Sequence, residues 1–370
     1  MDVIIVGGGV IGCSAAYHLA SSGLRVTFLE RAEVASEATG AAAGMLAPLA
    51  EASEKGPLLD MKLASLRLFP EEIEEIEGES GIDVEHASSG LLRLALSEAD
   101  EKELRRRLAW QREMGLPLEW LPGEDILALE PRLTSKVIGG IYSPAESQVN
   151  PERLALAYAR AAVAKGAVLR SGVNVTGLIC TGGRVVGART SAGDFMADHA
   201  VLAAGPWTPA LARDLGWNLP ILPVRGQMIA LGGMTLPIRH MVWGKGAYLA
   251  PKSNNILFVG ATVEEVGFRK RTTARARAWL ESRARLLAPP LAHAQTVSHW
   301  AGLRPGTVDG LPILGPLPGW QGVSIASGHF RNGVLLSPIT GRLAAQWLTG
   351  RSTDLDLTPF SPARFAGIAL

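Results

Sequence analysis

A glycine-rich turn between a buried strand and a helix is the feature that most constrains this chain. Residues 2–6 are apolar and β-branched, which predicts a strand buried on both faces, and residues 10–22 have helical spacing. Between them, Gly7, Gly9 and Gly12 match the pattern G-x-G-x-x-G. The pattern allows a tight turn, close approach of a pyrophosphate and close helix packing. The helix N-terminus then faces the phosphates, so the turn predicts a dinucleotide site.

Glu30 adds a second, independent indication of a dinucleotide. It follows a predicted strand at residues 25–29 and lies 18 residues beyond Gly12. A carboxylate at this place accepts hydrogen bonds from a ribose diol and repels a 2′-phosphate, which disfavours NADP. The alternative is that Glu30 only solvates the end of the strand.

Two segments with little side-chain chemistry favour FAD over NAD. Residues 36–45 are mostly small, and residues 200–207 form an apolar strand that ends in a glycine turn at Gly205. Both segments suit a chain that lies against a large flat ligand and contacts it through backbone N–H groups. Close packing at a strand crossing is the alternative explanation for either segment alone.

Composition excludes several function classes. The chain has 370 residues, 47% of them hydrophobic and 19% charged, with a formal net charge of +1. This balance gives no reason to expect a nucleic acid or an anionic membrane as a partner. No basic leader and no run of roughly 18 apolar residues is present, so a soluble cytoplasmic protein is expected. The length suits two domains, and the lack of a linker suggests that they are interleaved.

Cysteine and histidine usage predicts no metal site. Cys13 and Cys180 are the only cysteines, too few for a disulfide framework or a four-thiolate site, and both are expected to be buried. His240, His293 and His299 lack the spacing of metal ligands.

Further elements follow from periodicity and capping signals. Helices are expected at residues 60–78, 97–114, 151–165, 272–287 and about 333–348, with Asn150 capping the third. Strands are expected at 89–96 and through most of 167–204 and 221–263, with a turn at 253–255.

At the family level, the chain resembles the D-amino-acid oxidase superfamily of flavoproteins. The glycine fingerprint, residues 39–45 and residues 201–207 carry the resemblance, which covers essentially the whole chain. The strings WAGLRPGT at 300–307 and GHFRNG at 328–333 are similar to motifs of the glycine oxidases within that superfamily. Residues 246–252 resemble the substrate strand of the same enzymes.

The resemblance implies an α/β fold in which a Rossmann-like FAD-binding domain is interleaved with an antiparallel-sheet α+β substrate domain. The FAD-binding domain is expected at 1–85, 143–220 and 300–370, and the substrate domain at 86–142 and 221–299. The implied cofactor contacts are Gly7, Gly9, Val10, Ile11, Gly12, Glu30, Arg31, Ala38, Thr39, Ala43, Gly44, Met45, Val175, Gly205, His329, Phe330, Arg331, Asn332, Gly333, Val334 and Leu335. Some relatives attach flavin to a cysteine in the C-terminal region. This chain has none after Cys180, so non-covalent FAD is expected.

The same resemblance implies that Arg304 binds the substrate carboxylate with help from Tyr248 and Arg331. A guanidinium suits that task because it binds a carboxylate bidentately and keeps its charge. Three alternatives remain open: that Arg304 pairs with a structural carboxylate such as Asp309, that Tyr248 is a packing ring, and that Arg331 is a surface arginine. His329 is expected to contact the flavin or the core, because hydride transfer from a neutral amine requires no strong base.

The implied activity is oxidation of glycine, with sarcosine and small D-amino acids as side substrates. A hydride passes to flavin N5, O2 is reduced to H2O2, and the imine or glyoxylate product feeds thiazole synthesis for thiamine. Family analogy suggests a homo-oligomer, commonly a tetramer. Rival functions are a D-amino-acid dehydrogenase that reduces a quinone, a non-catalytic flavin-binding factor and a nicotinamide dehydrogenase.

Overall fold

A six-stranded sheet carries the glycine turn. The computed structural model describes residues 1–52, 54–233 and 238–367. The strand order is β19-β20-β12-β1-β2-β8, parallel throughout except for β19. The strands are β1 (Asp2–Val6), β2 (Arg25–Leu29), β8 (Val168–Arg170), β12 (His199–Leu202), β19 (Ile313–Pro316) and β20 (Val323–Ser327). The first two of these, with the helix between them, form the predicted strand–helix–strand unit.

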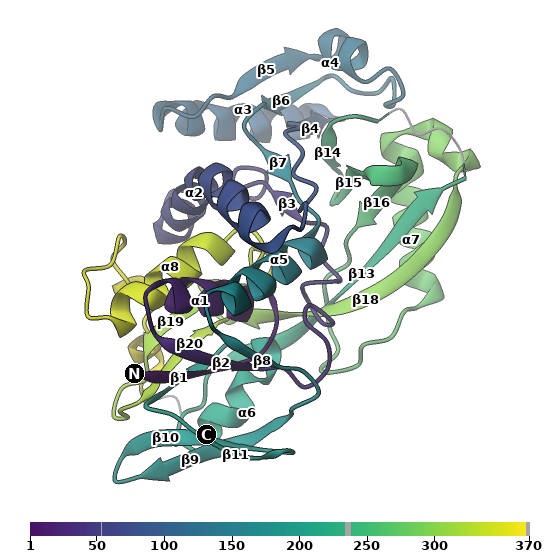
Figure 1. The fold of residues 1–370 in the computed structure, drawn as a ribbon. Helices are drawn as coiled ribbons and strands as arrows, with labels where there is room; N and C mark the ends of the chain where they lie inside the picture. The colour runs from purple at the N-terminus through teal and green to yellow at the C-terminus, as the bar shows by residue number, and fades with distance from the viewer. Residues whose placement is uncertain (53, 234–237, 368–370) are drawn as a thin grey trace.

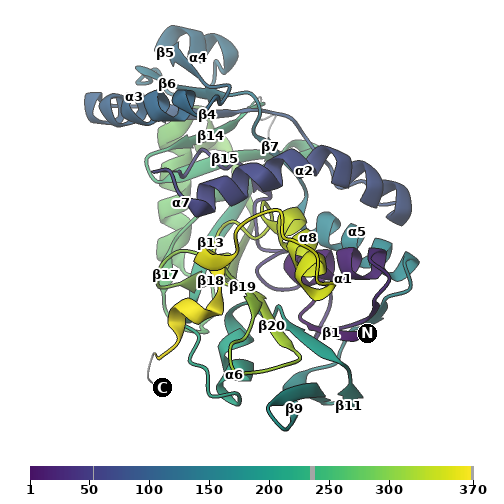
Figure 2. The same cartoon turned by 90° about the vertical axis from the view of Figure 1, so that its left-hand side faces the viewer.

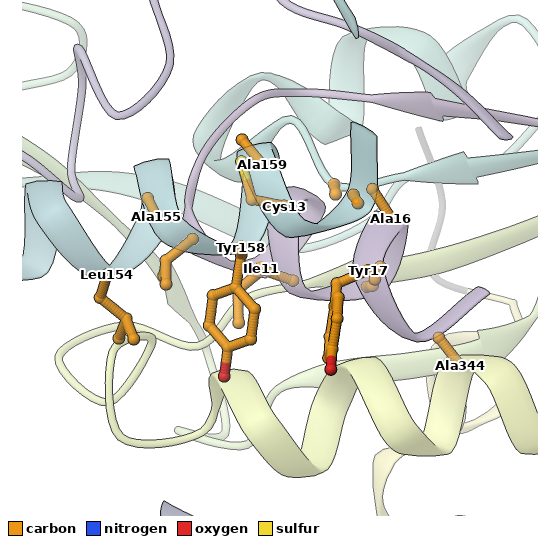
Figure 3. Close-up of a cluster of buried hydrophobic side chains, with 14 of the residues drawn as sticks. Ile11, Cys13, Ala16, Tyr17, Leu154, Ala155, Tyr158, Ala159 and Ala344 are labelled. Atoms are coloured by element: carbon orange, nitrogen blue, oxygen red, sulfur yellow. The ribbon is translucent and has the colours of Figure 1, made fainter. Parts of the chain in front are cut away.

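Four helices pack together over one face of this sheet (Figures 1 and 2). They are α1 (Val10–Ser21), α2 (Pro57–Ser80), α5 (Pro151–Ala164) and α8 (Ser337–Leu348). Small side chains from α1, α5 and α8 let the helix axes approach closely, and the rings of Tyr17 and Tyr158 fill the space beside them (Figure 3). This layer fixes the position of the N-terminus of α1, which faces the glycine turn.

The opposite face of the sheet is covered by a smaller layer. A three-stranded sheet of β9 (Val175–Thr181), β10 (Arg184–Thr190) and β11 (Gly193–Met196) packs there with α6 (Thr208–Arg213). The core between the layers contains Ile4 and Val6 from β1 together with Leu178, Val185 and Leu211. The sheet is thus buried on both faces, as the apolar pattern of residues 2–6 predicted.

A second, nine-stranded sheet stands beside the first (Figure 1). Its order is β17-β13-β16-β15-β14-β4-β6-β5, and β18 pairs with β13 along its whole length. The strands are β4 (Leu91–Ala95), β5 (Glu119–Pro122), β6 (Gly139–Ser143), β13 (Ile221–Gly232), β14 (Met241–Gly244), β15 (Ala247–Lys252), β16 (Ile256–Gly260), β17 (Glu264–Glu265) and β18 (Gln295–Thr307). Helices α3 (Glu98–Glu113), α4 (Gly123–Leu129) and α7 (Ala274–Leu287) pack against it.

The two sheets draw on alternating stretches of the chain. Strands of the six-stranded sheet fall within 1–85, 143–220 and 300–370, whereas β6 and β18 of the larger sheet extend across the boundaries expected at 142/143 and 299/300. We keep the two-domain division as a proposal. A short ladder of β3 (Met45–Leu46) and β7 (Ser147–Gln148) adds a further link. The 3-10 turns lie at Gly205–Trp207, Ser253–Asn255, Pro289–His293, Thr358–Phe360 and Pro362–Phe365.

Most expected elements are present, and two expectations are wrong. The last helix begins at Ser337 rather than near Gly333, because residues 333–336 form turns and Pro338 fits the first turn of the helix. Cys13 is buried as expected, but Cys180 is exposed, because it lies in the small outer sheet. None of the helices in the described ranges combines the length and apolarity required to cross a membrane.

Substitutions at two glycines should have opposite effects on stability. A Cβ on Gly12 would lie 1.9 Å from the carbonyl oxygen of Gly7, and α1 would have to move away from β1. At exposed Gly78, inside α2, a Cβ would have no described atom within 4 Å. Urea unfolding should show Gly12→Ala destabilising by about 1–3 kcal/mol or more and Gly78→Ala stabilising by about 1 kcal/mol. Equal shifts of both variants would contradict this packing.

Candidate functional site

A long cleft runs from the glycine turn to the inner face of the nine-stranded sheet. Every residue predicted to contact cofactor or substrate lines this cleft except Gly12, which lies behind it against Gly7. The lining comes from both sheets and from loops far apart in sequence. Among the described residues, no group of three His, Cys, Asp or Glu side chains is arranged to hold a metal ion.

The glycine turn leaves room for a ligand by packing tightly on its other side. Gly7 has φ +116°, and a Cβ there would lie 2.5 Å from the carbonyl oxygen of Ala203. The Thr39 hydroxyl accepts a hydrogen bond from the N–H of Val10 at 3.0 Å, which holds the small-residue segment at the N-terminus of α1. Gly9, Val10 and Ile11 then present the first turn of the helix to the cleft.

Glu30 stands where the second strand ends. Its Oε2 accepts a hydrogen bond from the N–H of Gly8 at 2.7 Å, and its Oε1 accepts one from Ala32 at 2.9 Å. These bonds fix the carboxylate, and each oxygen keeps acceptor capacity for a further donor. Next to it, the Arg31 guanidinium lies 3.8 Å from the centre of the Trp207 ring.

The segment at residues 36–45, called here the small-residue segment, has small side chains because the backbone of neighbouring elements lies close to it. Gly44 has φ +78°, and a Cβ there would lie 2.0 Å from the carbonyl oxygen of Val149. A Cβ on Gly302 of β18 would lie 2.5 Å from the Cβ of Ala41. Thr39 and Ala43 are buried. The segment therefore forms a smooth wall between the two sheets.

The loop before α8, residues 329–335, forms one wall of the cleft. Phe330 has φ +49°, an uncommon value for a residue with a side chain, and its N–H donates to the carbonyl oxygen of Pro305. His329 is buried, and its Nε2 lies 3.1 Å from the Thr340 hydroxyl. Burial lowers the pKa of His329 to about 3, so this imidazole stays neutral at physiological pH.

Arg304 lies at the end of the cleft formed by the large sheet. It pairs in register with Val224 of β13, and its guanidinium lies over Gly226, where a Cβ would come within 2.1 Å of Nη1. Nη1 donates to the carbonyl oxygen of Thr262 at 3.1 Å. Burial lowers the pKa of Arg304 below its ordinary value. Asp309, the alternative partner, instead forms an ion pair with Arg364 at 2.7 Å.

Tyr248 faces the same space from β15. A Cβ on Gly260 of the neighbouring strand would lie 2.2 Å from its ring, so a glycine in this strand makes room for the tyrosine. The hydroxyl donates to the sulfur of Met228 at 3.4 Å, and the ring packs on Trp243 at 5.3 Å. Burial raises the pKa of Tyr248, which keeps the hydroxyl protonated and able to donate.

Arg331 reaches the cleft but is not free. It forms an ion pair with Glu51 at 2.5 Å, and its guanidinium lies 5.5 Å from the centre of the Trp243 ring. The side chain is about one-quarter exposed, so it is not the surface arginine considered as an alternative. Of the two arginines, Arg304 therefore has more hydrogen-bond donors available to a ligand carboxylate, because Arg331 already pairs with Glu51.

Four further residues line the cleft, although no role was assigned to them from the sequence: Glu51, Trp207, Met228 and Trp243. Glycines inside strands signal close approach of another group, but they point to residues other than these four: Gly226 meets Arg304, Gly260 meets Tyr248 and Gly302 meets Ala41. Glu51 had no such signal, because its position depends on how the loop after β3 folds back.

That loop is held by a buried carboxylate. Glu146 is 1% exposed, and its Oε1 accepts hydrogen bonds from the N–H groups of Leu49 at 2.8 Å and Ala50 at 3.3 Å. These bonds place Glu51 opposite Arg331. Burial raises the pKa of Glu146 to about 7.

The residues present fit a flavin dinucleotide. The glycine turn, the helix N-terminus and Glu30 suit a pyrophosphate and a ribose, and the smooth wall and neutral His329 suit a flat, uncharged ring. A family model described as "FAD dependent oxidoreductase" (DAO) matches residues 2–347.

Individual relatives agree along the whole chain. A glycine oxidase of Geobacillus kaustophilus is 38% identical over 99% of this chain and 97% of that protein, and its crystal structure superposes with a TM-score of 0.95 over 99% of each chain. A glycine oxidase of Pseudomonas aeruginosa is 37% identical over 98% of both chains. The bifunctional protein ThiO/ThiG of Trichormus variabilis is 34% identical over 98% of this chain, which spans 55% of that longer protein.

The raised pKa of Glu146 predicts a pH dependence of stability. The pKa of Glu146 is 4.5, its ordinary value, in the unfolded chain and about 7 in the folded chain. Between pH 4.5 and pH 7 the folded chain therefore binds more protons than the unfolded chain. The free energy of unfolding should therefore fall as the pH rises from 4.5 to 7. Because Glu146→Gln does not titrate, it should remove up to about 3 kcal/mol of this fall, measured by urea unfolding with saturating FAD. Glu124→Gln, at an exposed glutamate, is the control; equal slopes for all three proteins would contradict the prediction.

Proposed function

The chain belongs to the DAO family of FAD-dependent oxidoreductases, and on that premise we propose that it oxidises glycine. The net reaction is glycine + O2 + H2O → glyoxylate + NH3 + H2O2. The observation that carries the proposal is Arg304: among the described residues it has no carboxylate in an ion pair, and it lies in the cleft beside the Tyr248 hydroxyl. A small amino acid offers the carboxylate that this cation lacks.

The chemistry that FAD supplies when bound is acceptance of a hydride equivalent from Cα at flavin N5, followed by electron transfer to O2. The protein's task is to hold the substrate and stabilise charge. Arg304 binds the carboxylate through charge-assisted hydrogen bonds, and the protonated Tyr248 hydroxyl donates to the same group. With a pKa of about 3, the His329 imidazole is uncharged at neutral pH and is a weak base. This is consistent with a substrate amine that reacts in its neutral form.

The pocket walls favour a small substrate. Met228, Trp243 and Tyr248 pack together around the space beside Arg304, and the Glu51–Arg331 pair limits it on the loop side. Sarcosine and small D-amino acids are the side substrates that such a space would admit. We further propose that the imine or glyoxylate product supplies thiazole synthesis, a proposal supported by the similarity to the ThiO/ThiG protein.

Anaerobic mixing with glycine is the test of this function. Glycine should bleach the oxidised flavin absorbance band, and admission of air should restore it with one H2O2 per glycine consumed. Arg304→Gln should lower kcat/KM roughly 10- to 150-fold, the equivalent of about 1.5–3 kcal/mol for a hydrogen bond to a charged group. Tyr248→Phe removes one neutral donor and should cost less.

Two outcomes would contradict the proposal. Bleaching without peroxide, together with rapid reduction of a quinone or dye, would indicate a dehydrogenase. Bound FAD that no amino acid bleaches would indicate a non-catalytic flavoprotein.

A further inference from the structure

The segment after β16 runs along the large sheet as β17 and then reaches the dinucleotide part of the cleft. Its first residues form β17, which pairs with Val224 and Arg225 of β13 at the edge of the sheet (Figure 2). Arg225 is 5% exposed and anchors the base of the segment. Its Nη2 forms an ion pair with Glu264 at 2.5 Å, and its Nη1 donates to the carbonyl oxygens of Arg269 and Arg271, both at 3.1 Å. We call residues 264–271 the clasp.

The clasp contacts one part of the cleft lining through a cation. Lys270 Nζ lies 2.7 Å from Glu37 Oε2 and 3.4 Å from the carbonyl oxygen of Ser36. Both Ser36 and Glu37 line the cleft, in the small-residue segment. Glu37 also accepts a hydrogen bond from Arg31 at 2.6 Å.

The clasp contacts a second, separate part of the lining through an aromatic ring. Phe268 packs on Trp207 with 5.5 Å between ring centroids and an angle of 35°. Trp207 also interacts with the Arg31 guanidinium, 3.8 Å from the ring centroid. Phe268 is 53% exposed, so this contact is open to solvent on one side.

Together these contacts close a ring around one stretch of the cleft. Arg31 contacts Glu37, Glu37 contacts Lys270, the clasp leads to Phe268, Phe268 packs on Trp207, and Trp207 returns to Arg31. A clasp that joins two separate linings hinders any ligand that leaves between them. We infer that residues 264–271 form a gate for the dinucleotide. The clasp must release Glu37 and Trp207 before FAD enters or leaves the cleft.

The strengths of the contacts suit a gate rather than a permanent seal. The Lys270–Glu37 and Arg31–Glu37 pairs are each about one-third exposed, so solvent and salt weaken them. The buried Arg225 has three hydrogen-bond partners and holds the backbone of the clasp at Arg269 and Arg271 as well as the Glu264 side chain. The tip of the clasp, formed by the side chains of Phe268 and Lys270, can therefore turn away while the backbone stays anchored and β13 stays paired with β17. This inference concerns cofactor exchange and holds for any substrate.

The test is the rate of FAD exchange, without any amino acid present. FAD-loaded protein is diluted, and release is followed by the rise in flavin fluorescence; binding to apoprotein is followed by its quenching. Phe268→Ala and Lys270→Ala should each speed release at least threefold and also speed binding, because an open gate admits as well as releases the cofactor. Added salt should speed release from the wild type more than from Lys270→Ala.

Arg269→Ala is the matched control, because among the described residues this exposed side chain has its one hydrogen bond to the carbonyl oxygen of Val266, within the clasp. It should exchange FAD at the wild-type rate. The inference is overturned if both tip variants stay within twofold of the wild-type release rate. It is also overturned if release speeds up with an unchanged binding rate, since the contacts would then add affinity without gating. Neither result depends on whether glycine is the substrate.

Discussion

The guanidinium of Arg304 lies in the cleft wall with a backbone carbonyl as its protein partner, at 3.1 Å. Removing a cation from water is costly unless other groups compensate it, and burial correspondingly lowers its pKa. The fold maintains this arrangement through strand register: β18 places Arg304 opposite Val224, and Gly226 leaves the space for its head. A buried cation without a carboxylate in an ion pair supports the proposal that an anionic ligand binds here, beside Tyr248 and Arg331.

The two halves of the cleft depend on different physical constraints. At the dinucleotide half, close backbone packing at Gly7, Gly12 and Gly44 leaves a smooth surface and exposes a helix N-terminus. At the substrate half, long side chains lie across glycines in neighbouring strands, as Arg304 and Tyr248 do. The halves meet where Gly302 of the large sheet touches Ala41 of the small-residue segment. The dinucleotide half and the proposed substrate half thereby form one continuous cleft, and the clasp links them at a second point.

Local patterns in the sequence indicated a dinucleotide site and where it begins, whereas most individual cofactor contacts were implied by family resemblance. The glycine fingerprint lies between a strand and a helix in a single stretch, and Glu30 follows at the end of the next strand. Asn150 was also predicted correctly as a cap, because its side chain accepts a hydrogen bond from a residue only three positions later. The sheet that carries Arg304 is different: the roles of its residues came from family resemblance, since the long pairing of β13 with β18 cannot be read from periodicity. Glu51 was missed for the same reason, because a buried carboxylate 95 residues further on fixes its loop. The prediction that Cys180 is buried was wrong, because its apolar sequence neighbours lie in β9, a strand of the small outer sheet where this side chain is exposed.

Whether Arg304 receives the substrate carboxylate is tested by a crystal structure of the FAD-loaded protein soaked with glycolate. Glycolate has the carboxylate of glycine and a hydroxyl in place of the amine. We expect both carboxylate oxygens within hydrogen-bond distance of the Arg304 guanidinium, with the Tyr248 hydroxyl donating to one of them. A carboxylate bound to Arg331 instead, with Glu51 displaced and Arg304 still bonded to Thr262, would contradict it.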